Sequence, residues 1–179
     1  MADDWRSDVL DYWFGLDPKC WWRGPPELDR EIRDRFHELW KDKRRLPADC
    51  FLDDPLTALA AVILFDQFPR NMFRGHADQF STDPLALAIA RAAVDMNLDD
   101  KLDKRERQFL YMPFQHSEDI DDQNRAVLLF TKLGDDYLLG FARKHRDLIA
   151  RFGRFPHRNE MLGRAPRADE IAAGDVVPW

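Results

Sequence analysis

The sequence predicts an all-α fold in which antiparallel helix pairs stack into a right-handed array. Three observations support this fold class. Apolar residues recur at helical spacing over most of the 179 residues. Helix-starting and helix-ending residues bracket the periodic segments, and no alternating strand pattern lies between them. Two short sequence echoes indicate that the helices repeat as pairs.

The first half of the chain contains three predicted helix starts. An apolar stripe at 28–39 follows Pro25-Pro26 and ends in a basic run at 41–45, so we expect one helix there. Asp54 and Asp83 each stand before a proline and an Ala/Leu-rich run. Carboxylates in that position commonly cap the helix N-terminus, so we expect both aspartates to be N-caps.

The second half contains three more predicted helices. Asp103 and Glu106 have the spacing of a capping box ahead of the next apolar stripe. Beyond them, Ile120 to Leu133 and Asp135 to Phe152 show helical periodicity. Gly134 separates these two segments, as a helix-ending glycine does. We therefore expect two helices joined at this glycine.

The echoes indicate how the helices are organised. "DPLTALA" at Asp54 recurs as "DPLALAIA" at Asp83, and an aromatic residue or Met precedes proline at Phe68, Met112 and Phe155. The residue before proline avoids helical geometry, so we expect helices to end at these three places. Helix pairs at regular spacing are typical of stacked repeats. We expect a single helical-repeat domain covering residues 1–179.

Composition excludes several classes of function. A net charge of -6 opposes a dedicated nucleic-acid partner, because neutralising phosphates requires a basic face. No apolar run reaches the length of a membrane span, so we expect no membrane partner. The acidic start and only two cysteines favour the cytoplasm. The oligomeric state stays open.

Sequence motifs for familiar catalytic chemistry are missing. The chain has no GxSxG elbow, no P-loop and no GxGxxG, so we expect no cofactor. "HELWK" at His37 lacks the second histidine of a zinc protease, and His116, Glu118 and Asp119 lack the helical spacing of metal ligands. We expect no metal, and whether the chain is an enzyme stays open.

Three polar segments at the proline positions form the candidate ligand site. They are "DQFPRN" followed by Arg74, "MPFQHSED" and "RFGRFPHRN". We expect side chains of all three segments to converge on one cleft. The predicted ligand-binding residues are Asp66, Gln67, Arg70, Asn71, Arg74, His116, Glu118, Asp119, His157, Arg158 and Asn159.

Local structure offers an alternative role for many of these residues. Asp66 and Arg70 are four residues apart and could form a helix-surface ion pair, or Arg70 could cap carbonyls that Pro69 frees. Ser117 is a suitable N-cap for the helix that follows. His145 lies in an apolar stripe, so we expect it in the core with a carboxylate partner.

The arginines near the third segment have two possible uses. We expect Arg151 and Arg154 to stabilise the helix end at Gly153, and Arg158 to face the cleft. Between residues 151 and 167 there are five arginines and one glutamate. Such a patch can pair with the acids after Ser117, or it can hold a carboxylate or phosphate through bidentate contacts. The apolar tail "VVPW" either docks on its own chain or pairs with a second subunit.

Five motifs resemble a bacterial family known as domain of unknown function 924. They are "YWFG" at Tyr12, "LFDQFPRNMFRG" at Leu64, "FSTDPLALA" at Phe80, "ERQFLYMPFQHSED" at Glu106, and "RFGRFPHRN" at Arg151 with "LGR" ending at Arg164. The resemblance covers nearly the whole chain. It implies a tetratricopeptide-like helical-repeat fold and a bacterial origin, and it implies no reaction. This chain departs from the family pattern after "LGR", which puts the C-terminal helix in question.

Three hypotheses for function follow. The leading one is a polar, arginine-lined cleft that binds a small anionic ligand or an acidic peptide terminus. The second is a hydrolase or lyase in which His116 or His157 acts as the acid-base group and an arginine stabilises negative charge. The third is a tetratricopeptide-like interaction adaptor whose polar segments only fix helix junctions.

Overall fold

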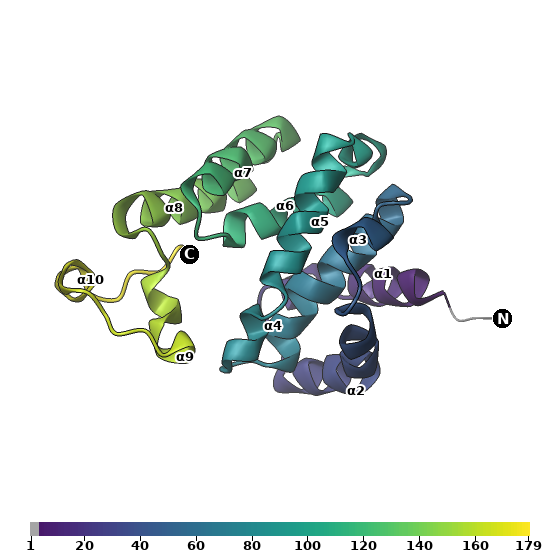
Figure 1. Cartoon of the computed structure of the whole chain (residues 1–179), viewed down its shortest axis with the longest axis horizontal. Helices are drawn as coiled ribbons and strands as arrows, with labels where there is room; N and C mark the ends of the chain where they lie inside the picture. Colours follow the sequence, from purple (N-terminus) through teal and green to yellow (C-terminus); the bar gives the residue numbers. More distant parts are fainter. Residues whose placement is uncertain (1–3) are drawn as a thin grey trace. The chain divides into compact units, whose positions relative to one another are not determined.

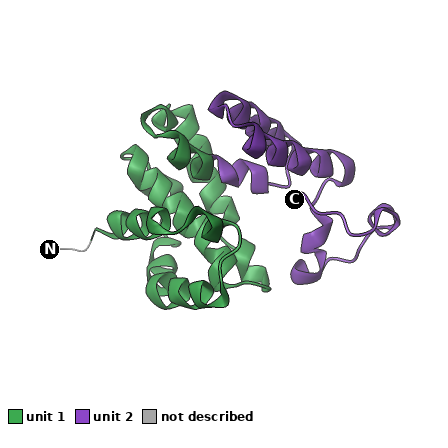
Figure 2. Ribbon diagram, turned by 180° about the vertical axis from the view of Figure 1, so that it is seen from behind, with its two compact units in different colours: residues 1–110 green, residues 111–179 purple. Residues whose placement is uncertain are grey.

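The structure is a computed structural model that describes residues 4–179, and every regular element in that range is helical. The predicted all-α class is therefore confirmed. The chain forms two compact units, unit 1 up to Leu110 and unit 2 from Tyr111 onward (Figure 2). One domain over residues 1–179, and right-handed tetratricopeptide-like stacking of helix pairs, stay predictions. Within residues 4–179, no helix has the length and apolar content that crossing a bilayer demands.

Unit 1 is built from helices that bury their apolar faces on one another. Helix α2 packs against α4, and α3 packs against both α1 and α5. The core between them is rich in aromatic rings, and the Phe36 and Phe68 ring centroids lie 4.6 Å apart. The helices of this unit are α1 (Trp5–Gly15), α2 (Pro26–Lys43), α3 (Pro55–Val62), α4 (Phe68–Met72), α5 (Asp83–Asp95) and α6 (Lys104–His116), the last of which continues into unit 2 (Figure 1).

The predicted caps of unit 1 are confirmed in two cases and wrong in one. Asp54 Oδ1 accepts hydrogen bonds from the first main-chain N–H groups of α3, at 3.0 Å. Asp103 and Glu106 form the expected capping box, with both reciprocal bonds at 2.8 Å. Asp83 is not a cap, because α5 begins at Asp83 itself and Thr82 holds the N-cap position. The Asp83 carboxylate is instead bound by Arg70.

The expected helix ends at Pro69 and Pro113 are wrong, because helical structure continues through both prolines. Before Pro69 the chain forms a π-helical turn, η3 (Ile63–Gln67), which joins α3 to α4. Pro69 has no N–H, so the carbonyl four residues earlier, that of Phe65, loses its usual helical donor. The Thr82 hydroxyl replaces that donor, at 2.7 Å from the Phe65 oxygen.

We expect Thr82→Val to lower the free energy of unfolding by about 2 kcal/mol, because it strands two buried polar groups. One is the Phe65 carbonyl, and the other is the Trp40 indole N–H, which donates to the Thr82 hydroxyl at 3.1 Å. Urea unfolding measures the loss. Thr82→Ser keeps the hydroxyl and should be clearly milder. A negligible loss for Thr82→Val would show that the two hydrogen bonds of this hydroxyl do not stabilise the chain.

Unit 2 is organised around the antiparallel hairpin of α7 (Ile120–Leu133) and α8 (Asp136–Phe152), which lie side by side in Figure 1. These bounds confirm both predicted helices. Gly134 ends α7 in the left-handed conformation, with φ 76°, which a residue without Cβ adopts at no steric cost. Two short helices follow, α9 (Asn159–Leu162) and α10 (Ala168–Ala173), so a C-terminal helix is present.

Part of the C-terminal tail packs against the core of unit 2. Phe155 is fully buried, and it packs in one cluster with Leu148, Ile149 and Phe152. Val176 packs against the same cluster, and the Trp179 ring lies 5.0 Å from the ring of His157. The tail therefore contacts its own unit, which is one of the two alternatives left open by the sequence.

Candidate functional site

The first polar segment begins with a buried carboxylate in the π-helical turn. The side chain of Asp66 is fully buried, and Gln67 Nε2 donates to its Oδ2 at 2.7 Å. Arg70 Nη1 lies 3.6 Å from Asp66 Oδ1 and also donates to the Asp66 main-chain oxygen. An Asp66–Arg70 ion pair, one of the two alternatives for Arg70, is therefore present, but it does not lie on the helix surface because Asp66 is fully buried. The π-helical turn is what brings this carboxylate inside unit 1.

Arg70 makes its closest ion pair with Asp83, at the start of α5. Its two terminal nitrogens each lie 2.9 Å from one Asp83 oxygen, which is the bidentate geometry that suits a guanidinium. Burial alone lowers the pKa of Arg70, and the two carboxylates outweigh burial and raise that pKa above its ordinary value. Arg70 thus ties the π-helical turn to α5. This partner was not predicted from the sequence, because Asp83 lies at a position where a helix N-cap is expected.

Asn71 and Arg74 share one acceptor, Asp29 of α2. Asn71 Nδ2 donates to Asp29 at 2.9 Å, and Arg74 donates to both carboxylate oxygens at 2.6 and 2.9 Å. Burial raises the pKa of Asp29, and the hydrogen bonds from Arg74 and Asn71 hold it below its ordinary value. The Arg74 side chain is 58% exposed and Asp29 is 18% exposed, so the arginine end of this pair is open to solvent. Sequence reasoning missed Asp29, which lies 45 residues from Arg74 along the chain.

In unit 2, the carboxylate of Glu118 is held by the third polar segment and the residues that follow it. Arg164 donates to both of its oxygens, at 2.7 and 3.0 Å. The main-chain N–H of Phe155 donates to Glu118 Oε1 at 2.8 Å. Burial raises the pKa of Glu118, and these hydrogen bonds outweigh burial and lower it. One of the two uses predicted for the arginine patch, pairing with an acid after Ser117, is therefore confirmed for Glu118.

Arg158 is buried, with 7% of its surface exposed. Its Nη2 donates to the main-chain oxygen of His116 at 3.0 Å, at the last residue of α6. Its guanidinium carbon lies 4.7 Å from the centre of the Phe155 ring, which is a cation–π contact. Arg158 therefore links the end of α6 to the third polar segment within unit 2.

Asn159 belongs to a second ion-pair network around Glu170 of α10. Arg154 binds Glu170 in bidentate fashion at 2.7 and 2.9 Å, and Asn159 Nδ2 donates to the same carboxylate at 3.1 Å. Arg154 is structural, as expected, but it binds Glu170 and the Ala165 main-chain oxygen instead of the carbonyls that end α8. The arginine that donates to the Phe152 main-chain oxygen there is Arg167, at 3.0 Å.

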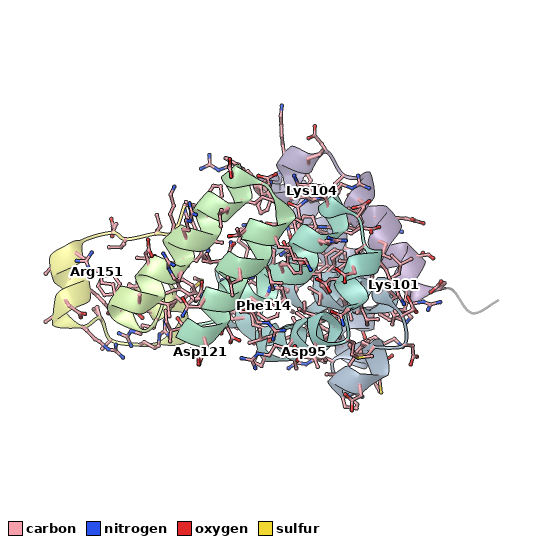
Figure 3. The ribbon with its side chains drawn as sticks, turned by 90° about the horizontal axis from the view of Figure 1, so that it is seen from above. Asp95, Lys101, Lys104, Phe114, Asp121 and Arg151 are labelled. Carbon is pink, nitrogen blue, oxygen red and sulfur yellow. The ribbon has the colours of Figure 1, made fainter. Side chains whose placement is uncertain are left out.

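Arg151 is exposed, and its guanidinium lies over the Phe152 ring at 4.7 Å. We expected Arg151 to stabilise the end of α8, but within residues 4–179 it donates no hydrogen bond to the carbonyls there. Figure 3 labels Arg151 near the C-terminal end of α8 and Asp121 in the first turn of α7, at the same end of the hairpin. The basic end of α8 thus lies beside the acidic start of α7.

The N-cap of α7 is Asp119, two residues after the predicted cap Ser117. Asp119 Oδ1 accepts from the N–H groups of Asp121 and Asp122 at 2.8 and 3.2 Å. Ser117 supports the turn instead, since its hydroxyl donates to Asp122 at 2.6 Å. Gln123 Nε2 donates to the main-chain oxygens of Gln115 and Ser117 and so satisfies the end of α6. The site residue Asp119 has a complete structural role in this capping.

Two histidine rings contact Phe155 in unit 2, His145 at 5.6 Å and His157 at 5.5 Å between ring centroids. His145 is buried as predicted, and its Nδ1–H donates to the main-chain oxygen of Phe141 at 2.7 Å, so the expected carboxylate partner is wrong. Burial lowers the pKa of His145 to about 3. Burial, with the nearby charge of Arg158, lowers the pKa of His157 to about 4. Both rings are therefore neutral at pH 7, and His157 Nδ1 is buried without a hydrogen-bond partner among residues 4–179.

The candidate residues thus fall into two groups. Five of them, from Asp66 to Arg74, lie in unit 1, and six, from His116 to Asn159, lie in unit 2. A cleft shared by both groups stays a prediction. Two surface cavities of about 440 and 420 Å³ lie in unit 1 and are lined by other residues. In the described part of the chain, no three His, Cys, Asp or Glu side chains are grouped for metal binding.

The all-helical fold is shared with a bacterial protein of unknown function. The chain belongs to the family described as bacterial protein of unknown function (DUF924), which matches residues 9–173. Its fold is similar to the solved structure of a protein of unknown function, ATU0120, from Agrobacterium tumefaciens. The two chains are 39% identical with a TM-score of 0.88, over 94% of this chain and 95% of that one. No curated protein matches the chain.

Proposed function

We propose that the chain binds a small anionic ligand, or the acidic end of a peptide, through the carboxylate cradle of unit 2. The cradle consists of the Arg164 guanidinium and the Phe155 main-chain N–H, with the charge of Arg158 nearby. It offers three hydrogen-bond donors and positive charge, which is what a carboxylate or phosphate group requires.

The observation that carries this proposal is the manner in which Glu118 is bound. Its carboxylate receives a two-pronged arginine contact and a main-chain N–H, as an external carboxylate would. The Glu118 side chain is 27% exposed, so solvent and small solutes reach it. Glu118 therefore acts as an internal ligand that an external anion of the same geometry can replace.

The other two hypotheses remain alongside this one. For a hydrolase or lyase, the lowered pKa of His157 makes its ring neutral at pH 7, so the ring would begin the reaction as a proton acceptor. For a tetratricopeptide-like adaptor, the contacts of Arg70, Gln123 and Arg158 at helix junctions are the roles that hypothesis assigns to the polar segments. Anion binding is preferred because the partly exposed carboxylate of Glu118 gives it a defined site.

The test is chemical rescue of Glu118→Ala by acetate. The substitution empties the cradle and should lower the free energy of unfolding by about 1 to 2 kcal/mol, because the Phe155 N–H and Arg164 lose their acceptor. Acetate that fills the cradle should restore stability, by about 1.4 kcal/mol at ten times its dissociation constant. Urea unfolding with and without acetate at constant ionic strength measures the rescue.

The control is the double variant Glu118→Ala with Arg164→Ala, which removes the main donors. Acetate should stabilise Glu118→Ala more than the double variant, and chloride at the same ionic strength should stabilise neither selectively. If acetate and chloride act alike on Glu118→Ala, the cradle does not recognise carboxylates and the proposal fails. Native ligands are then sought by screening anionic metabolites against the parent chain in the same assay.

A further inference from the structure

Helix α8 has a glycine in its interior that the rest of the chain does not explain. Gly140 lies five residues into this 17-residue helix, with ordinary helical backbone. A Cβ atom built at Gly140 would meet nothing within 4 Å. Glycine lowers helix stability relative to alanine, so its presence is unfavourable for α8 alone. Glycine on a helix surface does, however, allow a second backbone to approach closely.

The residues around Gly140 form an exposed aromatic face. Tyr137 is 71% exposed, and its ring lies 5.0 Å from the ring of Phe141, edge to face. The Lys144 ammonium lies over the Phe141 ring, 5.3 Å from its centroid. Large exposed aromatic side chains favour contact with a partner, because that contact removes apolar area from water.

The charges on this face are arranged symmetrically about Gly140. Asp136 lies four residues before it and Lys144 four residues after it, and both are exposed. Neither has an ion-pair partner within residues 4–179. In an antiparallel pairing of two α8 helices that cross at Gly140, Asp136 of each copy would face Lys144 of the other. The same rotation would bring Tyr137 of each copy near Arg143 of the other.

We propose that a second copy of this chain occupies the α8 face, forming a two-fold symmetric dimer that crosses at Gly140. The face is self-complementary in charge, which is the condition for an isologous interface. The face has opposite charges at its two ends and aromatic rings between them. A second copy of the same face therefore supplies every complementary group, and no other segment is required. A helix of this length is about 25 Å long, which limits the contact area, so the dimer dissociates on dilution.

Charge reversal tests the pairing directly. Sedimentation equilibrium of the parent chain should show monomer and dimer in exchange. In Asp136→Lys, the new lysine of each copy would face Lys144 of the other copy. In Lys144→Asp, the new aspartate of each copy would face Asp136 of the other copy. Each variant alone should raise the dimer dissociation constant at least tenfold. An equimolar mixture of the two variants should regain dimerisation, because each copy then supplies the charge that the other requires.

Matched controls separate this pairing from general effects of charge. Asp11→Lys and Lys101→Asp make the same charge changes on exposed residues of unit 1 and should leave the dissociation constant unchanged. Gly140→Leu should abolish the dimer while circular dichroism shows the helical content retained. A parent chain that stays monomeric at all concentrations overturns the proposal. A mixture that dimerises no better than its separate components overturns it equally.

Discussion

Replacing Arg70 with alanine should lower the free energy of unfolding by about 3 kcal/mol, as expected when one partner of a largely buried ion-pair cluster is removed. The variant leaves the carboxylates of Asp66 and Asp83 without their shared guanidinium. Asp66 is fully buried and the side chain of Asp83 is only 17% exposed, so water cannot fully compensate the lost charge. Urea unfolding at pH 7 measures the difference from the parent chain.

Arg74→Ala is the matched control, because it removes the same side chain from the same segment. Its guanidinium is mostly exposed and pairs with Asp29, so the expected loss is about 0 to 1 kcal/mol. Equal losses for the two variants would contradict the prediction, since burial of the carboxylates would then not matter. A loss near zero for Arg70→Ala would instead favour a ligand-binding role for this residue, because binding groups often add no stability.

Lowering the pH from 8 to 4 should cost the chain about 3 kcal/mol of stability through His145 alone. The folded-state pKa of His145 is about 3, whereas the unfolded chain binds the proton near 6.5. Between these values the unfolded state holds more protons than the folded state. The stability is therefore fully present above pH 6.5 and is lost as the pH falls toward 3. Urea midpoints measured across this range follow the loss.

The variant His145→Gln isolates this effect, because glutamine does not titrate. Its stability should fall less steeply than that of the parent chain between pH 6.5 and 4.5. His157, with a pKa of about 4, contributes to the slope that remains. Below pH 4.5 both chains lose the stabilisation of Glu170, whose pKa the Arg154 ion pair lowers to about 2. Parallel curves for parent and variant above pH 4.5 would show that His145 is protonated without cost in the folded chain.

Local signals predicted most helices because their causes lie within a few residues. The helix 120–133 has an apolar stripe and a terminal glycine, and the structure reproduces those bounds. The capping box of Asp103 and Glu106 formed because both partners belong to one turn. Predictions were wrong where a residue distant in sequence supplied a contact that local patterns do not include. At Pro69 the helix continues, since Thr82 supplies the hydrogen bond that proline removes.

The candidate site was less predictable, because its contacts join residues far apart in sequence. The sequence predicted that Arg70 and Glu118 are polar residues near helix junctions. It did not predict their partners, since Arg164 lies 46 residues from Glu118 and Asp83 resembles a cap. An arginine forms a bidentate contact with any carboxylate that the fold brings within about 3 Å. The spacing of residues in the sequence does not show which carboxylate that is.

The sequence by itself determined the all-α class, most helix bounds and the family, because periodicity, caps and motifs are local properties of the chain. Tertiary structure alone decided which charges are paired and which remain exposed. Arg70, Arg154 and Arg164 became parts of internal ion pairs, while Lys144 stayed in solvent beside Gly140. The physical reason is that an ion pair depends on distance and burial in space, and both are set only when the helices pack.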